Sequence, residues 1–319
     1  MSRYPKLDLA NVRLISIANR DSKVSSGDWA RPVSADASLA SFVDSLPNIL
    51  AARDLRRFAD LFVEGGQRGR PVILLMGAHV IKVGLGPLIC DLLEEGLLTG
   101  VAMNSAAAIH DTESALFGET SEDVAASITD GSFGMSRETG EFINGILGRS
   151  YDSDDPDIGY GEALGEAIQA EKVERPSIMA TCVRLGRPIT VHAAIGTDIV
   201  HQQPTMRGDA TGELSFRDFR LLCHELRDLG NGGVVLNIGS AVILPEVFLK
   251  ALTVVRNLGF PAFNFTTANF DMIQHYRPRV NVVQRPTQDG GEGFSFTGHH
   301  EIMIPLLAAM VKRRMRSEN

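Results

Sequence analysis

Five short apolar runs constrain this chain more than any other feature. Each ends in small or polar residues and leads into a helical pattern: PVILLMG from Pro71, GVAMNSAA from Gly100, PITVHAAIGTD from Pro188, GGVVLNIGSA from Gly232 and PAFNFTTANFD from Pro261. A short run that is apolar throughout indicates a strand covered on both faces. Strands that alternate with helices pair in parallel through right-handed crossovers. The sequence therefore predicts an α/β protein with a doubly wound, mainly parallel sheet and helices on both faces.

The same patterns predict a single domain over residues 1–319, because no linker, repeat or low-complexity tract divides the chain. Residues 1–35 are expected to be irregular, and apolar residues at helical spacing predict an N-terminal helix over 36–66. The core is expected to span 71–314. Its helices are predicted over 86–96, 105–117, 121–147, 160–172, 177–185, 215–229, 245–258 and 299–314.

Charge and composition exclude several kinds of partner. The 31 basic and 39 acidic residues leave a net charge of -8, which gives no general attraction for nucleic acid or anionic membranes. No apolar run approaches the roughly 18 residues of a membrane span. The three cysteines are scattered, which fits a reducing cytoplasm, and the histidines and carboxylates lack a recognised metal-ligand spacing. We expect a cytoplasmic protein that binds a small molecule and no metal.

The candidate ligand-binding residues follow the apolar runs, since ligands of open α/β sheets lie beyond the carboxyl ends of the strands. Small residues there let a ligand approach the backbone, and the N–H groups that open the next helix attract phosphate. This favours a nucleotide or dinucleotide, although GLGPLI at 84–89 matches only half of a dinucleotide fingerprint. The candidates are Gly77, Ala78, His79, Asn104, Ser105, Glu113, Thr197, Asp198, Gly239, Ser240, Thr266 and Thr267.

Histidines and carboxylates near the same strand ends are candidates for proton transfer. His110 and His300 are the predicted acid or base, because imidazole titrates near neutral pH. Asp111, Asp271 and Glu301 are expected to orient that histidine or a substrate ammonium. Two alternatives stay open: Ser105 and Thr197 also suit helix N-caps, and Lys82 also suits a solvated helix surface.

The strand ends resemble the deoxyhypusine synthase superfamily over residues 71–313. The resemblance lies in VAMNSAAAIHDTESALFG, PITVHAAIGTD, NIGSAVILPEVFLKALTVVRNLG, FNFTTANFD and EIMIPLLAAMV. It implies a Rossmann-like sheet that binds NAD, Asp198 as a cofactor or substrate ligand, and a homo-oligomer, a tetramer by analogy. One departure is clear: where that family has a lysine that carries the aminobutyl group, this chain reads RPRVNVVQRPTQDGG, with no lysine.

The segment NSAAAIHDTESALFG is also similar to a motif of the LOR/SDH group of ornithine cyclodeaminases. The matching residues are Asn104, His110, Asp111, Glu113 and Gly118. Members of both families use NAD to oxidise an amine carbon to an imine and later return the hydride. The resemblance implies an NAD-dependent enzyme that acts on an amine or amino-acid-like substrate through an imine. The alternatives are an aminobutyl transferase of the deoxyhypusine or homospermidine synthase type, and a noncatalytic NAD-binding protein.

Overall fold

The structure is a computed structural model that describes residues 3–316. Its contacts divide the chain into two compact units, Met1–Arg53 and Asp54–Asn319. The second unit holds the sheet and every residue of the predicted core, so the candidate site belongs to this unit alone.

Two helices stand where one N-terminal helix was predicted over 36–66. Helix α1 spans Leu39–Ser45 and helix α2 spans Leu50–Gln67. Pro47 lies between them and has no N–H to continue a helix, and Leu50 adopts a φ of 45°, outside the helical region. The prediction of one uninterrupted helix was therefore wrong. The segment before α1 is exposed and, apart from two single turns at Ile17–Asn19 and Ser26–Asp28, irregular, as expected.

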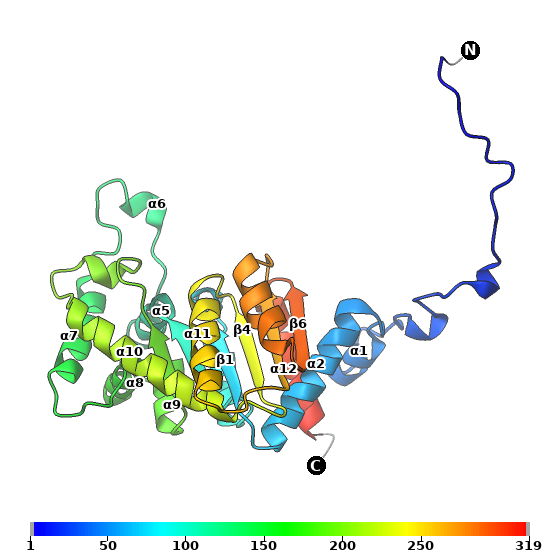
Figure 1. Cartoon of the computed structure of the whole chain (residues 1–319). Helices are drawn as coiled ribbons and strands as arrows, with labels where there is room; N and C mark the ends of the chain where they lie inside the picture. Colours follow the sequence, from blue (N-terminus) through cyan, green and yellow to red (C-terminus); the bar gives the residue numbers. More distant parts are fainter. Residues whose placement is uncertain (1–2, 317–319) are drawn as a thin grey trace. The chain divides into compact units, whose positions relative to one another are not determined.

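Six parallel strands form one sheet in the order β3-β2-β1-β4-β5-β6 (Figure 1). The strands are β1 (Val72–Met76), β2 (Gly100–Asn104), β3 (Ile189–His192), β4 (Val234–Ile238), β5 (Phe265–Asp271) and β6 (Gly291–Thr297). The chain reverses its direction of travel across the sheet between β1 and β4. This order confirms the Rossmann-like prediction and places the topological switch point at the carboxyl ends of β1 and β4.

Strand β6 is the one strand of the described sheet that the apolar runs did not predict. It lies at the edge beside β5, and most of its residues are partly or fully exposed. Its sequence GEGFSFT alternates polar and apolar residues and contains two glycines, which lowers its strand signal. Edge position explains why a continuous apolar run is absent.

The helices follow the predicted alternation, with one clear exception. They include α3 (His79–Lys82), α4 (Gly86–Glu94), α5 (Ser105–Leu116), α6 (Val124–Ser127), α7 (Arg137–Tyr151), α8 (Tyr160–Ala170), α9 (Ile178–Arg184), α10 (Gly208–Glu225), α11 (Ile243–Asn257) and α12 (His300–Arg316). The helix predicted over 121–147 is wrong, because Gly131 and Gly134 adopt positive φ between α6 and α7. Within residues 3–316 no helix has the length and apolarity needed to cross a membrane.

Apolar side chains of alternating residues cover the two faces of the sheet. Ile73 and Leu75 join a buried cluster with Phe248 of α11 and with residues of α10. Leu74 faces the opposite side and packs near Ile304 of α12, together with residues of α2 and α4. Each face is thus closed by helices, which leaves the carboxyl edge of the strands as the place where polar groups can gather.

Candidate active site at the carboxyl edge of the sheet

The loops that leave β1 and β4 touch at the switch point. Gly77 donates its N–H to the carbonyl of Ile238 at 3.0 Å, and a Cβ built on Gly77 would overlap the backbone of Gly239. Gly239 has a φ of 65°, and a Cβ there would lie 2.8 Å from Cε1 of His300. At both predicted glycines a side chain would therefore clash with its neighbours.

His300 opens α12 directly above this contact. Its Nε2 lies 3.1 Å from the carbonyl oxygen of Phe270, and a carbonyl only accepts, so Nε2 carries the ring hydrogen. Nδ1 is left as a buried acceptor, with no hydrogen-bond partner among the described residues. Burial is the largest cause of the lowered pKa of His300. The ring of His79 packs against it, with the two centroids 5.4 Å apart.

A pocket of about 180 Å³ lies beyond β2 and β3. It is lined by residues of α3, α5, the loop after β3 and the segment between α5 and α7. The lining residues are Lys82, Ala106, Ile109, His110, Glu113, Ser121, Glu122, Val124, Phe133, Ser136, Thr197, Asp198 and Ile199. Four of the predicted site residues, His110, Glu113, Thr197 and Asp198, therefore share one cavity.

His110 and Glu113 are joined through a third residue, Thr120. The hydroxyl of Thr120 donates to Oε2 of Glu113 at 2.5 Å, and Nδ1 of His110 lies 2.5 Å from the same hydroxyl. Since Thr120 has a single hydroxyl hydrogen, Nδ1 of His110 must be the donor to it. The other carboxylate oxygen of Glu113 accepts from Thr139 at 2.9 Å. The neutral ring consequently has its lone pair on Nε2.

The surroundings of His110 favour this neutral form. Burial and, to a smaller extent, the cation of Lys82 lower the pKa of His110, Asp198 raises it, and the net result is a pKa of about 4. At neutral pH the imidazole is a base with a free Nε2 and not an imidazolium. His110 can therefore accept a proton or a hydrogen bond from a bound molecule.

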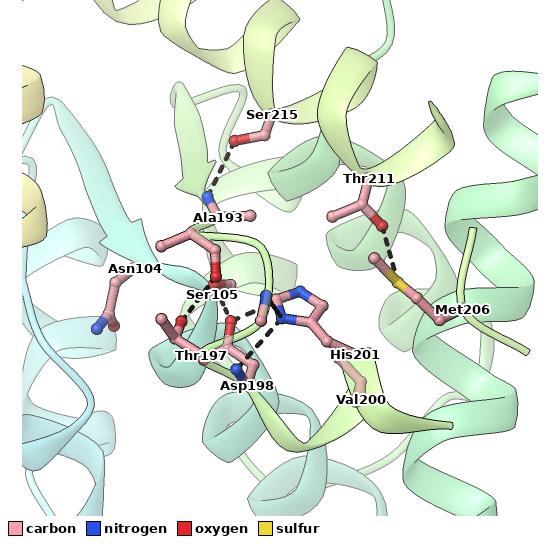
Figure 2. A network of polar contacts seen from close by, with 12 residues as sticks. Asn104, Ser105, Ala193, Thr197, Asp198, Val200, His201, Met206, Thr211 and Ser215 are labelled. Carbon is pink, nitrogen blue, oxygen red and sulfur yellow. Dashed lines mark hydrogen bonds and ion pairs between the residues drawn. The ribbon is translucent and has the colours of Figure 1, made fainter. Parts of the chain in front are cut away.

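Asp198 is held by a polar network of its own (Figure 2). The hydroxyl of Ser105 donates to Oδ2 of the carboxylate. His201 accepts the backbone N–H groups of Gly196 and Asp198 at Nδ1, both at 3.2 Å, which puts its hydrogen on Nε2. That buried Nε2 lies 3.8 Å from Oδ2 of Asp198 and has no hydrogen-bond partner in the part of the chain that the structure describes. The network fixes a carboxylate at the wall of the pocket.

Carboxylates dominate the charge of this region. Glu113, Glu122 and Asp198 line the pocket, and a neighbouring cavity of about 420 Å³ shares Glu113, Ser121, Glu122 and Ser136 with it and adds Glu119 and Glu138. Lys82 is the one lysine or arginine among the residues lining the two cavities. The arrangement suits a ligand that carries positive charge together with one anionic group.

Helix α3 connects the histidine pair and the pocket. It consists of four residues, of which the first, His79, packs on His300 and the last, Lys82, lines the pocket beside His110. Within residues 3–316 the two predicted proton-transfer histidines have different partners: His110 contacts Thr120, and His300 contacts His79 and Phe270. They belong to two clusters separated by one helical turn.

Asp111 was predicted to belong to the site, and this prediction is wrong. Its carboxylate is buried on the other side of α5, where it accepts from the hydroxyl of Ser177 at 2.7 Å and from the N–H groups of Ile178 and Met179 at 2.9 and 3.0 Å. It therefore caps the first turn of α9. Burial raises the pKa of Asp111 in spite of these three donors.

Thr266 and Thr267 were also placed wrongly. They lie at the beginning of β5, where Thr266 pairs with Val234, the first residue of β4. Both are buried at the amino edge of the sheet, and the carboxyl edge lies at Asp271. The predicted cofactor role failed because the run PAFNFTTANFD did not reveal that the strand begins only at Phe265.

Several other candidates have structural partners. Asn104 caps α5 by accepting the N–H of Ala107 at 3.0 Å, and the hydroxyl of Ser240 accepts the N–H of Leu244 at 3.2 Å. Thr197 donates to the carbonyl of Ala194 at 2.8 Å and still lines the pocket. Asp271 ends β5 near His300, whereas Glu301 is exposed beside His299. Ala78 begins the short turn of α3, next to Gly77.

Three residues of the site escaped the sequence interpretation. Lys82 also suited a solvated helix lysine, and its position six residues after the end of β1 gave no further signal. Thr120 lies between the helices predicted over 105–117 and 121–147 and was not chosen as a site residue, and neither was His201. The roles of Thr120 and His201 depend on how irregular chain folds back: Thr120 bonds to His110 and Glu113, and His201 accepts from Gly196 and Asp198, which no helix or strand pattern encodes.

No family model and no curated protein matches this chain. Solved structures do. A conserved putative LOR/SDH protein from Methanococcus maripaludis S2 has 18% identity and a TM-score of 0.52, over 82% of this chain and 70% of that one. AgrE, in a ternary complex with ornithine and NAD+, has 16% identity and a TM-score of 0.53, over 84% of this chain and 34% of that one.

The chain therefore spans about a third of the length of AgrE. A putative deoxyhypusine synthase from Entamoeba histolytica has 10% identity and a TM-score of 0.47, over 86% of this chain and 93% of that one. The resemblance to the LOR/SDH group is confirmed as a likeness of fold, and identities this low show no more than that.

Proposed function

We propose that the chain is an NAD-dependent enzyme that oxidises the amine of an amino-acid-like substrate. The observation that carries the proposal is the neutral His110, whose Nδ1 is engaged by Thr120, itself bonded to Glu113, in a carboxylate-rich pocket at the carboxyl edge of the sheet. The likeness of fold to AgrE, which was crystallised with ornithine and NAD+, supports it.

The switch point fits a dinucleotide in two respects. Gly77 and Gly239 keep their own side chains out of the contact between the loops after β1 and β4, which presents backbone there, and the unpartnered Nδ1 of His300 is a buried acceptor near Gly239. The backbone at Gly77, Ala78, Gly239 and Ser240 would hold the cofactor. When bound, NAD+ supplies the acceptor for a hydride.

The pocket would hold the substrate. Asp198 and Glu122 can pair with ammonium groups, and Lys82 with a carboxylate. An ammonium must lose a proton before its carbon can give up a hydride, and Nε2 of His110 can accept that proton. A substrate carboxylate on Lys82 would neutralise the cation that lowers the pKa of His110, which makes the imidazole a stronger base in the complex.

Absorbance of NADH tests the proposal directly. Purified protein with NAD+ is mixed with ornithine, arginine, lysine, spermidine and neutral amino acids, and we expect NADH to form with at least one compound that carries an amine. His110→Gln should lower kcat by about 10²- to 10⁴-fold, because it removes the proton acceptor.

His224→Gln is the matched control, because His224 lies on α10, is exposed and contacts Arg227 rather than the pocket. Its kcat should equal that of the wild type. Absence of NADH with every amine would refute the enzyme proposal, and full activity of His110→Gln would remove His110 from it.

A further inference from the structure

The segment of residues 119–133, here called the cover segment, forms one wall of the pocket. Ser121, Glu122, Val124 and Phe133 line the cavity from this side, opposite Lys82 and the residues of α5. The cover segment also supplies Thr120, the residue that joins His110 to Glu113. The cover segment therefore both forms a wall of the pocket and fixes the hydrogen of His110.

Both ends of the cover segment are anchored. Before it, Arg175 donates to the carbonyls of Ala115 and Leu116 at 3.0 and 2.6 Å and so holds the end of α5. After it, Gln203 donates to the carbonyl of Gly134 at 3.1 Å and to that of Ser136 at 2.9 Å. The flanking Gly118 and Gly134 have φ values of 78° and 73°, which suits them to be the points where the chain turns.

Between these anchors the segment has few ties to the rest of the protein. In the described structure, the hydrogen bonds of residues 121–132 stay within residues 119–136, as in the bond of Glu122 with the N–H of Gly134. Most of these residues are exposed. Thr120, together with the carbonyl of Phe133, which accepts from Gln202 at 2.6 Å, is what attaches the segment to its surroundings by hydrogen bonds in the described structure.

Thr120 cannot be replaced by a direct contact in this geometry. Nδ1 of His110 lies 3.9 Å from Oε2 of Glu113, too far for a hydrogen bond. Without the hydroxyl between them, nothing else in the described surroundings fixes the hydrogen of His110 on Nδ1. The other charged groups that face this ring are Lys82 from α3, Asp198 from the loop after β3 and Glu122 from the cover segment.

We propose that Thr120 is a positioning residue that the cover segment brings to His110 when it closes over the pocket, so that the base is set only in the closed state. Substrate enters with the segment open, and closing places the ring hydrogen on Nδ1 and the lone pair of Nε2 toward the substrate. This inference rests on the proposed role of His110, yet its structural part is testable without turnover.

The test compares Thr120→Val, which keeps the shape and removes the hydroxyl, with Thr120→Ser, which keeps the hydroxyl. Thr129→Val is the control, because Thr129 is exposed in the middle of the same segment. The first readout is the ¹⁵N NMR signal of His110, identified as the one missing from His110→Gln. We expect the Nδ1–H tautomer in the wild type, Thr120→Ser and Thr129→Val, and its loss in Thr120→Val.

The second readout is hydrogen exchange of the backbone amides. In Thr120→Val the amides of 121–133 should exchange about tenfold faster, while those of α5 keep their protection. The third is turnover: Thr120→Val should lose about tenfold or more in kcat with a smaller change in KM, and Thr120→Ser should recover most of it.

The tautomer tests the positioning role of Thr120, and hydrogen exchange tests the closing of the cover segment. An unchanged tautomer in Thr120→Val overturns the positioning role, and unchanged exchange overturns the closing role. If no amine is oxidised by the wild type, the proposed function fails, while the tautomer and the exchange rates still decide whether Thr120 positions His110 and holds the segment closed.

Discussion

At the scale of single residues, the partner of one imidazole nitrogen determines what the other can do. His300 donates from Nε2 to the carbonyl of Phe270 and leaves Nδ1 as the acceptor, whereas His110 donates from Nδ1 to Thr120 and leaves Nε2. His201 is fixed in turn by two backbone amides. Each of the three histidines at this edge of the sheet thus has a defined tautomer, with the hydrogen on Nε2 in His300 and His201 and on Nδ1 in His110.

Asp218 of α10 should make the stability of the protein depend on pH. It is buried and accepts the N–H groups of Gly161 and Val191 at 2.9 and 2.6 Å, and burial raises its pKa from 3.8 to about 8. A folded-state pKa above the unfolded value favours folding below pH 4, and this contribution is lost as pH rises toward 8. Asp218→Asn should remove a slope of about 1.4 kcal/mol per pH unit.

Urea unfolding at pH 5, 6.5 and 8 measures that slope. The free energy of unfolding of the wild type should fall across this range relative to that of Asp218→Asn, because the amide stays neutral and keeps the acceptor oxygen. Two parallel curves would show that Asp218 is ionised in the folded protein throughout.

The residues of the site were predictable to the extent that they follow an apolar strand directly. Gly77 and Gly239 were chosen because they come directly after β1 and β4, whereas Asp198 lies six residues after the end of β3. Asp111 was misassigned, since it is adjacent to His110 in sequence but points to the opposite side of the helix, toward Ser177. Thr120 was missed because its meaning comes from two partners on another element.

At the scale of elements, the contact between the loops after β1 and β4 depends on the absence of a side chain. Gly77→Ala should destabilise the protein by about 2–4 kcal/mol, because the new methyl group would overlap the backbone of Gly239 and force the two loops apart. Gly66→Ala is the matched control: it lies in α2 with open space around its Cβ position. It should stabilise the helix by about 0.5–1 kcal/mol.

Thermal or urea unfolding of both variants distinguishes the close approach from a general preference for glycine. If Gly77→Ala is as stable as the wild type, the switch-point loops have room that the structure does not show. A loss of stability in Gly66→Ala would mean that α2 has a neighbour at this position.

Elements were predictable where their own residues determine them. The five apolar strands were found because both of their faces are buried, and β6 was missed because an edge strand needs no continuous apolar run. The division of the predicted helix 121–147 into α6 and α7 depends on Gly131 and Gly134, whose positive φ ends the helical pattern. Glycine alone does not reveal in sequence which φ it adopts.

At the scale of the whole molecule, the first unit should be open to proteases. Arg13, Arg20 and Lys23 lie in an exposed stretch with little regular structure. Limited trypsin digestion should cut there first and leave a fragment that contains residues 54–316 intact, as judged by mass spectrometry. If the peptide bonds after Arg13, Arg20 and Lys23 resist trypsin as well as those within residues 54–316, the segment is covered in solution.

The strand order has a consequence for synthesis of the chain. Ile73 of β1 lies opposite Gly100 of β2 on one side and opposite Val235 of β4 on the other. A ribosome completes β1, β2 and β3 well before β4 emerges, so half of the sheet can assemble while the apolar flank of β1 has no neighbour. An unpaired strand edge is a template for association between nascent chains. We therefore expect nascent chains to be most prone to associate in the interval between translation of residues 76 and 234.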